Sequence, residues 1–389
     1  MNSYQAARDN FQYSVSLRRD FHRHPELGFK ETRTAGIVAN VLTELGLDVA
    51  TGIGETGVVG LLKSEKPGPV LLLRFDMDAL PIHEATGAEY ASIYPHVMHA
   101  CGHDGHVAIG LSVAKIFAER RDQFSGQIKF VFQPGEEGLG GAERMISAGV
   151  LENPRPDMAL AVHLWNEKPV GWYGISAGYI MAAAEIVNIH VHGIGGHGAL
   201  PHLAVDPVLA AADLVVALQS ITSRNIPPLD SAVVSVTTIH GGDSFNVIPD
   251  KVALSGTIRT FSPQVRQLVL KRFQQVCNGL GQAYECQVDS ELKMLTPAVF
   301  NNEKITKQVY NTASSSLPNP EIDQQYRVMV SDDMAFILQE IPGTYCFVGS
   351  ANPVKGLSAG HHQPSFDFDE EALVNAVGLV SSAVSSLIN

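Results

Sequence analysis

Val70-Leu71-Leu72-Leu73-Arg74-Phe75-Asp76-Met77-Asp78 is the stretch of sequence that decides the fold. Its first six residues are almost all apolar, which is typical of a β-strand that is covered on both faces. The strand runs directly into Asp76 and Asp78, and their spacing of two residues places both carboxylates on one face. A buried strand ending in cation-binding side chains predicts an α/β sheet with a site at the carboxyl edge.

Two later apolar segments end in the same way. Residues 128–133 lead to Glu136 and Glu137, and residues 158–162 lead to His163. Because open α/β sheets bind ligands beyond the carboxyl ends of their strands, we expect these loops to meet at one site. Further predicted elements are strands over 57–62 and 345–348 and helices over 4–24, 31–45, 107–121, 142–147 and from 370 onward. The fold class is therefore α/β, a mixed sheet with helices on both faces.

The segment 98–106 concentrates metal-binding side chains, with a thiol, three imidazoles and a carboxylate in nine residues. Cys101 and His103 are two residues apart, so in an extended segment both side chains leave on the same side. Thiolate, imidazole and carboxylate are ligands of first-row divalent metals. Asp104 is a candidate N-cap of the helix that follows. The alternative, a buried thiol in a polar loop, is the less favoured interpretation of so dense a cluster.

Residues 183–294 form a second pattern. Strands predicted over 184–192, 231–239, 252–260 and 284–292 alternate with helices over 206–223 and 263–281, and this β-α-β-β-α-β order is typical of the ferredoxin-like split βαβ motif. We therefore predict a catalytic metal-binding domain of residues 1–182 and 295–389 that is interrupted by an inserted α+β domain of residues 183–294.

Composition excludes several classes of protein. The chain has 389 residues, enough for two domains, and 45% of them are hydrophobic. Its formal net charge of −13 and the lack of Lys/Arg runs disfavour a nucleic-acid partner. No apolar run approaches the length of a membrane span, and the first residues lack a signal-peptide core. Four scattered cysteines without a C-x-x-C pair fit a reducing cytoplasm.

Ligands from dispersed loops describe a catalytic metal site better than a structural one, which usually pairs short C-x-x-C or H-x₃-H motifs. Glu136 and Glu137 are adjacent in a predicted turn, so one carboxylate could bind a metal while the other takes a proton from a metal-activated water. This chemistry hydrolyses an amide without a covalent intermediate. The alternative for such a pair is a solvated turn.

Seven segments together resemble one family, the metal-dependent amidohydrolases and carboxypeptidases that include hippurate hydrolases, indole-acetyl-amino-acid hydrolases and N-acetyl-diaminopimelate deacetylases. The resemblance covers nearly the whole chain. The segments are RRDFHRHPELG (18–28), DMDALP (76–81), HACGHDGH (99–106), QPGEE (133–137), GGHGALPH (195–202), NVIPD (246–250) and GTIRT (256–260).

The resemblance implies a binuclear site with two divalent ions per subunit, Zn²⁺ or Mn²⁺, with Ni²⁺ or Co²⁺ also compatible with these ligands. Glu136 matches the general base, and Asp78 matches an aspartate near the metals that orients a ligand. The ligand histidine precedes a proline by two residues, which selects His362 over His361. The implied ligands are Cys101, His103, Glu137, His163 and His362.

The resemblance also implies that the inserted domain is a lid that dimerises. His197 matches a histidine that stabilises the oxyanion, and Asn246 and Arg259 match residues that hold the substrate carboxylate. A surface ion pair is the alternative for Arg259. The chain departs from the family pattern at Gly135, where alanine is usual, at Phe75, and at residues 332–334.

The resulting hypothesis is a cytoplasmic, homodimeric or higher oligomeric amidohydrolase that cleaves N-acyl amino acids, with Glu136 as general base. A dipeptidase or carboxypeptidase of the same architecture is the nearest alternative. A non-catalytic protein that binds metal or acyl amino acids is a further one. A serine hydrolase is a remote alternative.

Overall fold

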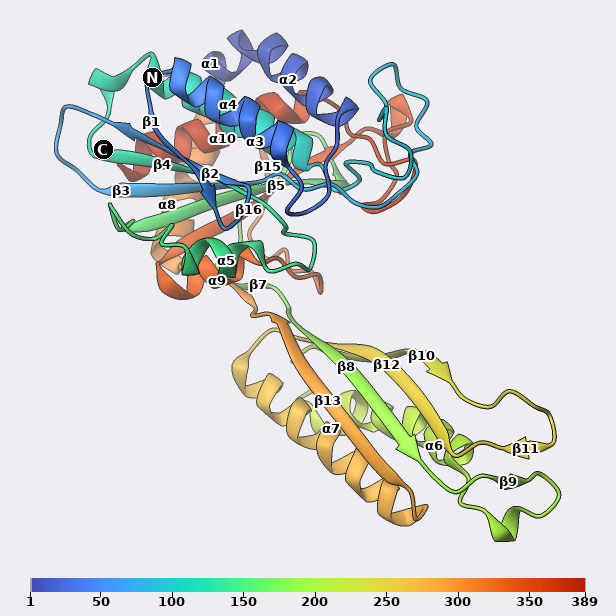
Figure 1. Cartoon of the computed structure of the whole chain (residues 1–389). Helices are drawn as coiled ribbons and strands as arrows, with labels where there is room; N and C mark the ends of the chain where they lie inside the picture. Colours follow the sequence, from blue (N-terminus) through green and yellow to red (C-terminus); the bar gives the residue numbers. More distant parts are fainter. Residues whose placement is uncertain (1, 389) are drawn as a thin grey trace. The chain divides into compact units, whose positions relative to one another are not determined.

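The computed structural model describes residues 2–388, which form two compact units (Figure 1). Of the described residues, unit 1 comprises 2–178, 300–327 and 333–388, and unit 2 comprises 179–299 and 328–332. The sequence-based boundaries lie a few residues inside those of unit 2. The short strands β7 (Gly178–Met181) and β14 (Val299–Asn301) contain the two main points at which the chain passes between the units.

Unit 1 is built on an eight-stranded mixed sheet in the order β1-β2-β4-β3-β5-β16-β6-β15. Its central strands β4, β3, β5 and β16 are parallel, and β1 and β2 pair antiparallel with their neighbours. Strand β6 pairs antiparallel with β16 and parallel with β15. The strands are β1 (Asp48–Ile53), β2 (Gly57–Lys63), β3 (Val70–Asp76), β4 (Gln127–Gln133), β5 (Met158–Pro169), β6 (Trp172–Gly174), β15 (Glu321–Asp323) and β16 (Gly343–Ala351).

Helices cover both faces of this sheet, as the sequence predicts (Figure 1). Helices α4 and α10 pack on one face together with α3, and α5 and α9 lie against the other. The helices of unit 1 are α1 (Ser3–Asp9), α2 (Phe11–Arg23), α3 (Thr32–Glu44), α4 (His103–Ala118), α5 (Gly141–Ser147), α8 (Glu303–Ser316), α9 (Met334–Glu340) and α10 (Glu371–Leu387). Every residue of β3 and of β16 is buried, which explains their continuous apolar sequence.

The predicted helix over residues 4–24 is two helices. The chain breaks at Asn10, whose side-chain amide donates to the backbone oxygen of Ala6 over 2.9 Å. Asparagine competes in this way with the backbone hydrogen bonds of a helix, so α1 ends there and α2 begins.

Unit 2 has a four-stranded antiparallel sheet in the order β10-β12-β8-β13. This is the strand order of the split βαβ motif that the sequence predicts, and α6 and α7 pack together against the sheet. Its elements are β8 (Ala183–His192), β9 (Gly196–His197), α6 (Pro207–Ser220), β10 (Ala232–His240), β11 (Val247–Ile248), β12 (Lys251–Thr260), α7 (Pro263–Ala283) and β13 (Gln287–Thr296). A separate apolar core fills the space between its sheet and helices.

Among residues 2–388, no helix has both the length and the apolar character that crossing a bilayer requires.

Candidate metal centre

The loop before α4 turns sharply at Gly102, which caps the helix with a left-handed backbone angle φ of +91°. Glycine adopts this conformation without steric cost. Two sequence-based expectations are wrong here: His103 is the first residue of α4, not part of an extended segment, and Asp104 is not the N-cap. Asp104 lies inside the first turn, where its buried carboxylate accepts hydrogen bonds from Arg18 and His22.

His103 presents one ring nitrogen to the site. Its Nδ1 lies 2.9 Å from the backbone oxygen of Asp78. A carbonyl oxygen only accepts, so Nδ1 carries the proton and Nε2 carries a lone pair. The buried Nε2 has no hydrogen-bond partner within residues 2–388. A buried lone pair without a donor is what a metal ligand offers.

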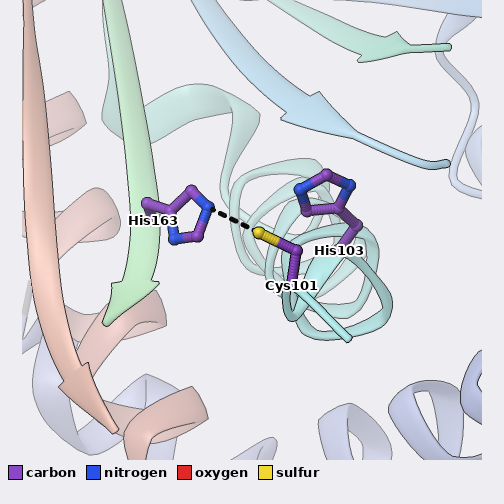
Figure 2. Close-up of side chains that lie close together, drawn as sticks. All are labelled: Cys101, His103 and His163. Carbon is purple, nitrogen blue, oxygen red and sulfur yellow. Dashed lines mark hydrogen bonds between the residues drawn. The ribbon is translucent and has the colours of Figure 1, made fainter. Parts of the chain in front are cut away.

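His163 is arranged in the same way. It lies on β5, and its Nδ1 donates to the backbone oxygen of Leu164 over 2.7 Å. The lone pair on Nε2 therefore points to Cys101, whose Sγ is 3.6 Å away (Figure 2). Cys101, His103 and His163 bring one ligand atom each to within 4.8 Å of one another.

Glu137 and His362 complete the predicted ligand set. The backbone N–H of Glu137 donates to Asp78 Oδ2 over 2.9 Å, and Glu137 Oε1 lies 3.2 Å from His362 Nε2. Cys101, Glu137 and His362 form a second donor group of the same compactness. Because Cys101 belongs to both groups, one sulfur faces two potential cation positions.

Glu136 lies beside this centre, grouped with His103 and Glu137. The turn that carries it begins at Gly135, which has φ of +58° and whose N–H donates to buried Glu31 over 3.0 Å. A Cβ at Gly135 would lie 2.8 Å from the Phe29 ring. The glycine that departs from the family pattern therefore suits the backbone angle at this position, and a side chain there would have to displace the Phe29 ring.

The electrostatics of the cluster favour a cation. Burial, with Glu137 adding to it, raises the pKa of Cys101 well above its usual value. Burial alone would lower the pKa of His103, but the Asp76 carboxylate and Cys101 outweigh it and raise that pKa. Burial lowers the pKa of His163, which stays neutral. Excess negative potential around these side chains fits divalent metal ions, which take the place of the proton on a ligand imidazole and hold a thiol deprotonated.

Sequence reasoning gave His106 no role, and the structure places it beside the cluster with both nitrogens occupied. Its Nε2 accepts the N–H of Leu164 over 3.0 Å, so Nδ1 carries the proton that it donates to Asp76. Asp76 is also bound by Arg74. His106 and Asp76 therefore contact each other beside the centre, and His106 has no free ring nitrogen for a metal. Its residue type and spacing alone do not distinguish it from a metal ligand.

A sequence model of peptidase family M20/M25/M40 matches residues 72–386 of the chain. The chain belongs to this peptidase family. It is 38% identical over 364 residues to thermostable carboxypeptidase 1 of Saccharolobus solfataricus, covering 92% of this chain and 91% of that protein. It is 36% identical over 364 residues to the hippurate hydrolase of Campylobacter jejuni, covering 92% of each.

A solved M20 structure shares the fold. The Bacillus subtilis YXEP protein, described as a dinuclear metal-binding peptidase, is 30% identical and superposes with a TM-score of 0.85, covering 98% of this chain and 99% of that one. The resemblance inferred from the seven sequence segments is therefore confirmed, as is the α/β fold class.

The other predicted site residues of this M20 chain lie on unit 2. His197 and Asn246 line a hollow of about 630 Å³ formed by the segments around β9 and β11. His197 Nδ1 accepts the N–H of Ala199 over 3.0 Å, so the neutral ring carries its proton on Nε2. Arg259, on β12, is half-buried and bonds to Thr257 and to its own strand, and among residues 2–388 it makes no ion pair. Residues 2–388 therefore do not show the surface ion pair considered as its alternative.

Proposed function

We propose that this chain is a binuclear metal-dependent hydrolase that cleaves the amide bond of N-acyl amino acids. The observation that carries the proposal is the pair of donor groups that share Cys101, with Glu136 beside them. Divalent cations in such a centre polarise a carbonyl group and lower the pKa of water to about 7. The proposed ligands are Cys101, His103, Glu137, His163 and His362.

Glu136 is the proposed general base. It accepts the proton of the attacking water and returns it to the leaving nitrogen, which keeps charge from accumulating in either step. Support comes from its position in the same turn as Glu137, with its carboxylate grouped with His103. Two hydrogen bonds fix the turn: the Glu31 carboxylate accepts the N–H of Gly135, and the Asp78 carboxylate accepts the N–H of Glu137.

Unit 2 is proposed to bind the substrate. The Nε2–H of His197 is a donor suited to the developing oxyanion. Arg259 is half-buried without a carboxylate partner among the described residues, which favours an anionic ligand, and its planar guanidinium suits the free carboxylate of an acyl amino acid. Asn246 is the proposed second contact to that carboxylate.

The native ions are proposed to be Zn²⁺ or Mn²⁺, with Ni²⁺ or Co²⁺ able to replace them. One thiolate and three imidazoles favour zinc, whereas the carboxylates accommodate manganese. A cytoplasmic location also remains a prediction, and the four free thiols are compatible with it.

We further propose a homodimer or higher homo-oligomer formed through unit 2. The outward face of α6 carries exposed Val208, Leu209 and Val216, with exposed fractions of 42%, 54% and 71%. An apolar helix face next to the edge strand β10 is suited to a second copy of the same surface.

The decisive experiment compares hydrolysis of N-acetyl and N-benzoyl amino acids with that of dipeptides and N-blocked peptides, after loading with each metal and measuring metal content. We expect the acyl amino acids to be cleaved with the highest kcat/KM. Faster cleavage of dipeptides or of C-terminal residues would favour the carboxypeptidase alternative, which the 38% identity to a carboxypeptidase supports. Tight binding of acyl amino acids without hydrolysis would indicate a non-catalytic protein.

A further inference from the structure

Two histidines lie close to the sulfur of Cys101. His163 Nε2 lies 3.6 Å from Sγ, and His361 Nδ1 lies 3.8 Å from it. The His163 ring is buried and His361 is partly buried, and the distances alone do not distinguish their roles. The distinction comes from where each ring carries its proton.

His163 faces the sulfur with a lone pair, because its proton is on Nδ1 and is donated to the backbone oxygen of Leu164. His361 is the reverse. Its Nε2 accepts the backbone N–H of Asn166 over 3.1 Å, so a neutral ring must carry its proton on Nδ1, the nitrogen that faces Cys101.

The ring of His361 is held firmly in this orientation. It stacks on Trp165 with 4.7 Å between ring centroids and 28° between planes, and Phe366 lies against it at 5.1 Å. Asn166, which fixes the ring through its N–H, is itself bound at both ends of its side chain, to Ser350 and to the backbone oxygen of Ala359. The donor is therefore aimed before any ligand arrives.

We propose that His361 is a positioning residue that donates its Nδ1–H to the Cys101 thiolate and so moderates the charge of the sulfur shared by the two donor groups. The inference rests on the proposed metal centre and deepens it: of the adjacent histidines His361 and His362, the second binds metal and the first binds the metal's sulfur ligand. A donated N–H stabilises a buried thiolate and lowers its electron donation to a cation.

The test uses cobalt(II) in place of the native ions, because a thiolate bound to cobalt gives a near-ultraviolet charge-transfer band whose energy reports on the electron density of the sulfur. His361→Gln extends to the Nε2 position, so it keeps an acceptor for Asn166 and removes the donor. His361→Asn ends at the Nδ1 position and retains the donor. His361→Phe removes both and keeps the stacked ring.

We expect the band to move to longer wavelength in the Gln and Phe variants and to stay at the wild-type position in the Asn variant, with two cobalt ions bound in all three. A merely structural role would not separate Asn from Gln. An unmoved band in Gln and Phe, or the same shift in Asn as in Gln, would overturn the proposal. So would the loss of one cobalt ion in the Gln variant, since His361 would then be a ligand.

Cys101→Ser identifies the sulfur. We expect it to abolish the band, and a band that persists would come from another cysteine and end the proposal. Both readouts are independent of turnover. A wild-type chain that binds two cobalt ions through Cys101 and cleaves no acyl amino acid would refute the proposed function and leave the role of His361 intact.

Discussion

The backbone N–H of Glu137 donates to the carboxylate of Asp78, with 2.9 Å between nitrogen and Oδ2. The same aspartate accepts, through its backbone oxygen, the Nδ1–H of His103 at 2.9 Å. Asp78, two residues after the end of β3, therefore contacts two proposed ligands that arrive from separate segments of the chain. These contacts are consistent with the supporting role that the family resemblance implies for Asp78, which stays a proposal.

Replacing Asp78 tests this supporting role. Asp78→Ala removes the carboxylate that holds the turn of Glu137, and we expect the affinity for metal to fall about 10- to 100-fold. Asp78→Asn keeps an oxygen that accepts the same N–H, so its affinity should lie nearer to that of the wild type. Competition with a chelator of known affinity measures both. An alanine variant that binds metal as tightly as the wild type would contradict the assignment.

Glu136→Gln tests the general base. The amide keeps the size of the carboxylate but does not accept a proton at neutral pH, so we expect turnover to fall by at least about 10²- to 10⁴-fold with both metal ions retained. Steady-state rates and metal analysis on the same sample provide the measurement. Glu143→Gln, an exposed carboxylate on the following helix α5, is the matched control and should retain activity. Near-normal turnover of the Glu136 variant would exclude that role.

Arg259→Ala tests recognition of the substrate carboxylate. A charge-assisted hydrogen bond contributes about 1.5–3 kcal/mol, so we expect KM for acyl amino acids to rise about 10- to 100-fold with a smaller change in kcat. Acyl amino acid amides, which lack the carboxylate, should be affected little. Arg224, exposed on the same unit, provides a control substitution. Equal losses on both substrate types would show that Arg259 acts through the fold of unit 2 instead.

The sequence predicted what depends on burial. The strands β3 and β16 are buried along their whole length, so a continuous apolar run marked them. Strand β1 escaped prediction because it is an edge strand with mostly exposed residues, and exposure removes the apolar signal. The sequence did not predict that α4 begins at His103, because this start depends on the left-handed backbone angle of Gly102. A glycine permits that angle, but its presence does not predict it.

The sequence also predicted some features of the candidate site and not others. Residue types and family resemblance nominated the ligands, since Cys101 and His163 stand out by chemistry and position. Residue types alone did not separate a proposed ligand histidine from a supporting one, and only the family resemblance chose His362 over His361. That difference depends on which backbone group meets each ring: the N–H of Leu164 meets His106 and that of Asn166 meets His361. These contacts join segments far apart in the chain, and only the folded structure brings them together.

Glu31→Ala tests how the catalytic turn is supported. The Glu31 carboxylate is fully buried and accepts the N–H of Gly135 and the hydroxyl of Thr56. Removing it leaves a buried N–H unsatisfied, which costs about 1–3 kcal/mol of unfolding free energy and loosens the turn that carries Glu136. We expect kcat to fall with it. Urea unfolding measures the free energy of unfolding, and steady-state kinetics measure kcat. Glu31→Gln, which keeps an acceptor, should retain most of the wild-type stability and most of the wild-type kcat. An alanine variant of unchanged stability would refute this account.

The exposed apolar face of α6 makes the proposed homodimer testable with a matched pair of substitutions. Val216 is 71% exposed on that face, and Val354 is 97% exposed on unit 1, far from it in sequence. A glutamate buried in an apolar interface carries the desolvation cost of an unpaired charge, so Val216→Glu should shift the protein from twice the mass of one chain to once that mass. Val354→Glu adds the same charge to a surface that the proposal leaves exposed, and this variant should stay dimeric.

Sedimentation equilibrium distinguishes the mass of a dimer from that of a monomer without reference to activity. A wild-type chain that sediments as a monomer, or a Val216→Glu variant that remains a dimer, would show that copies of this chain do not associate through α6.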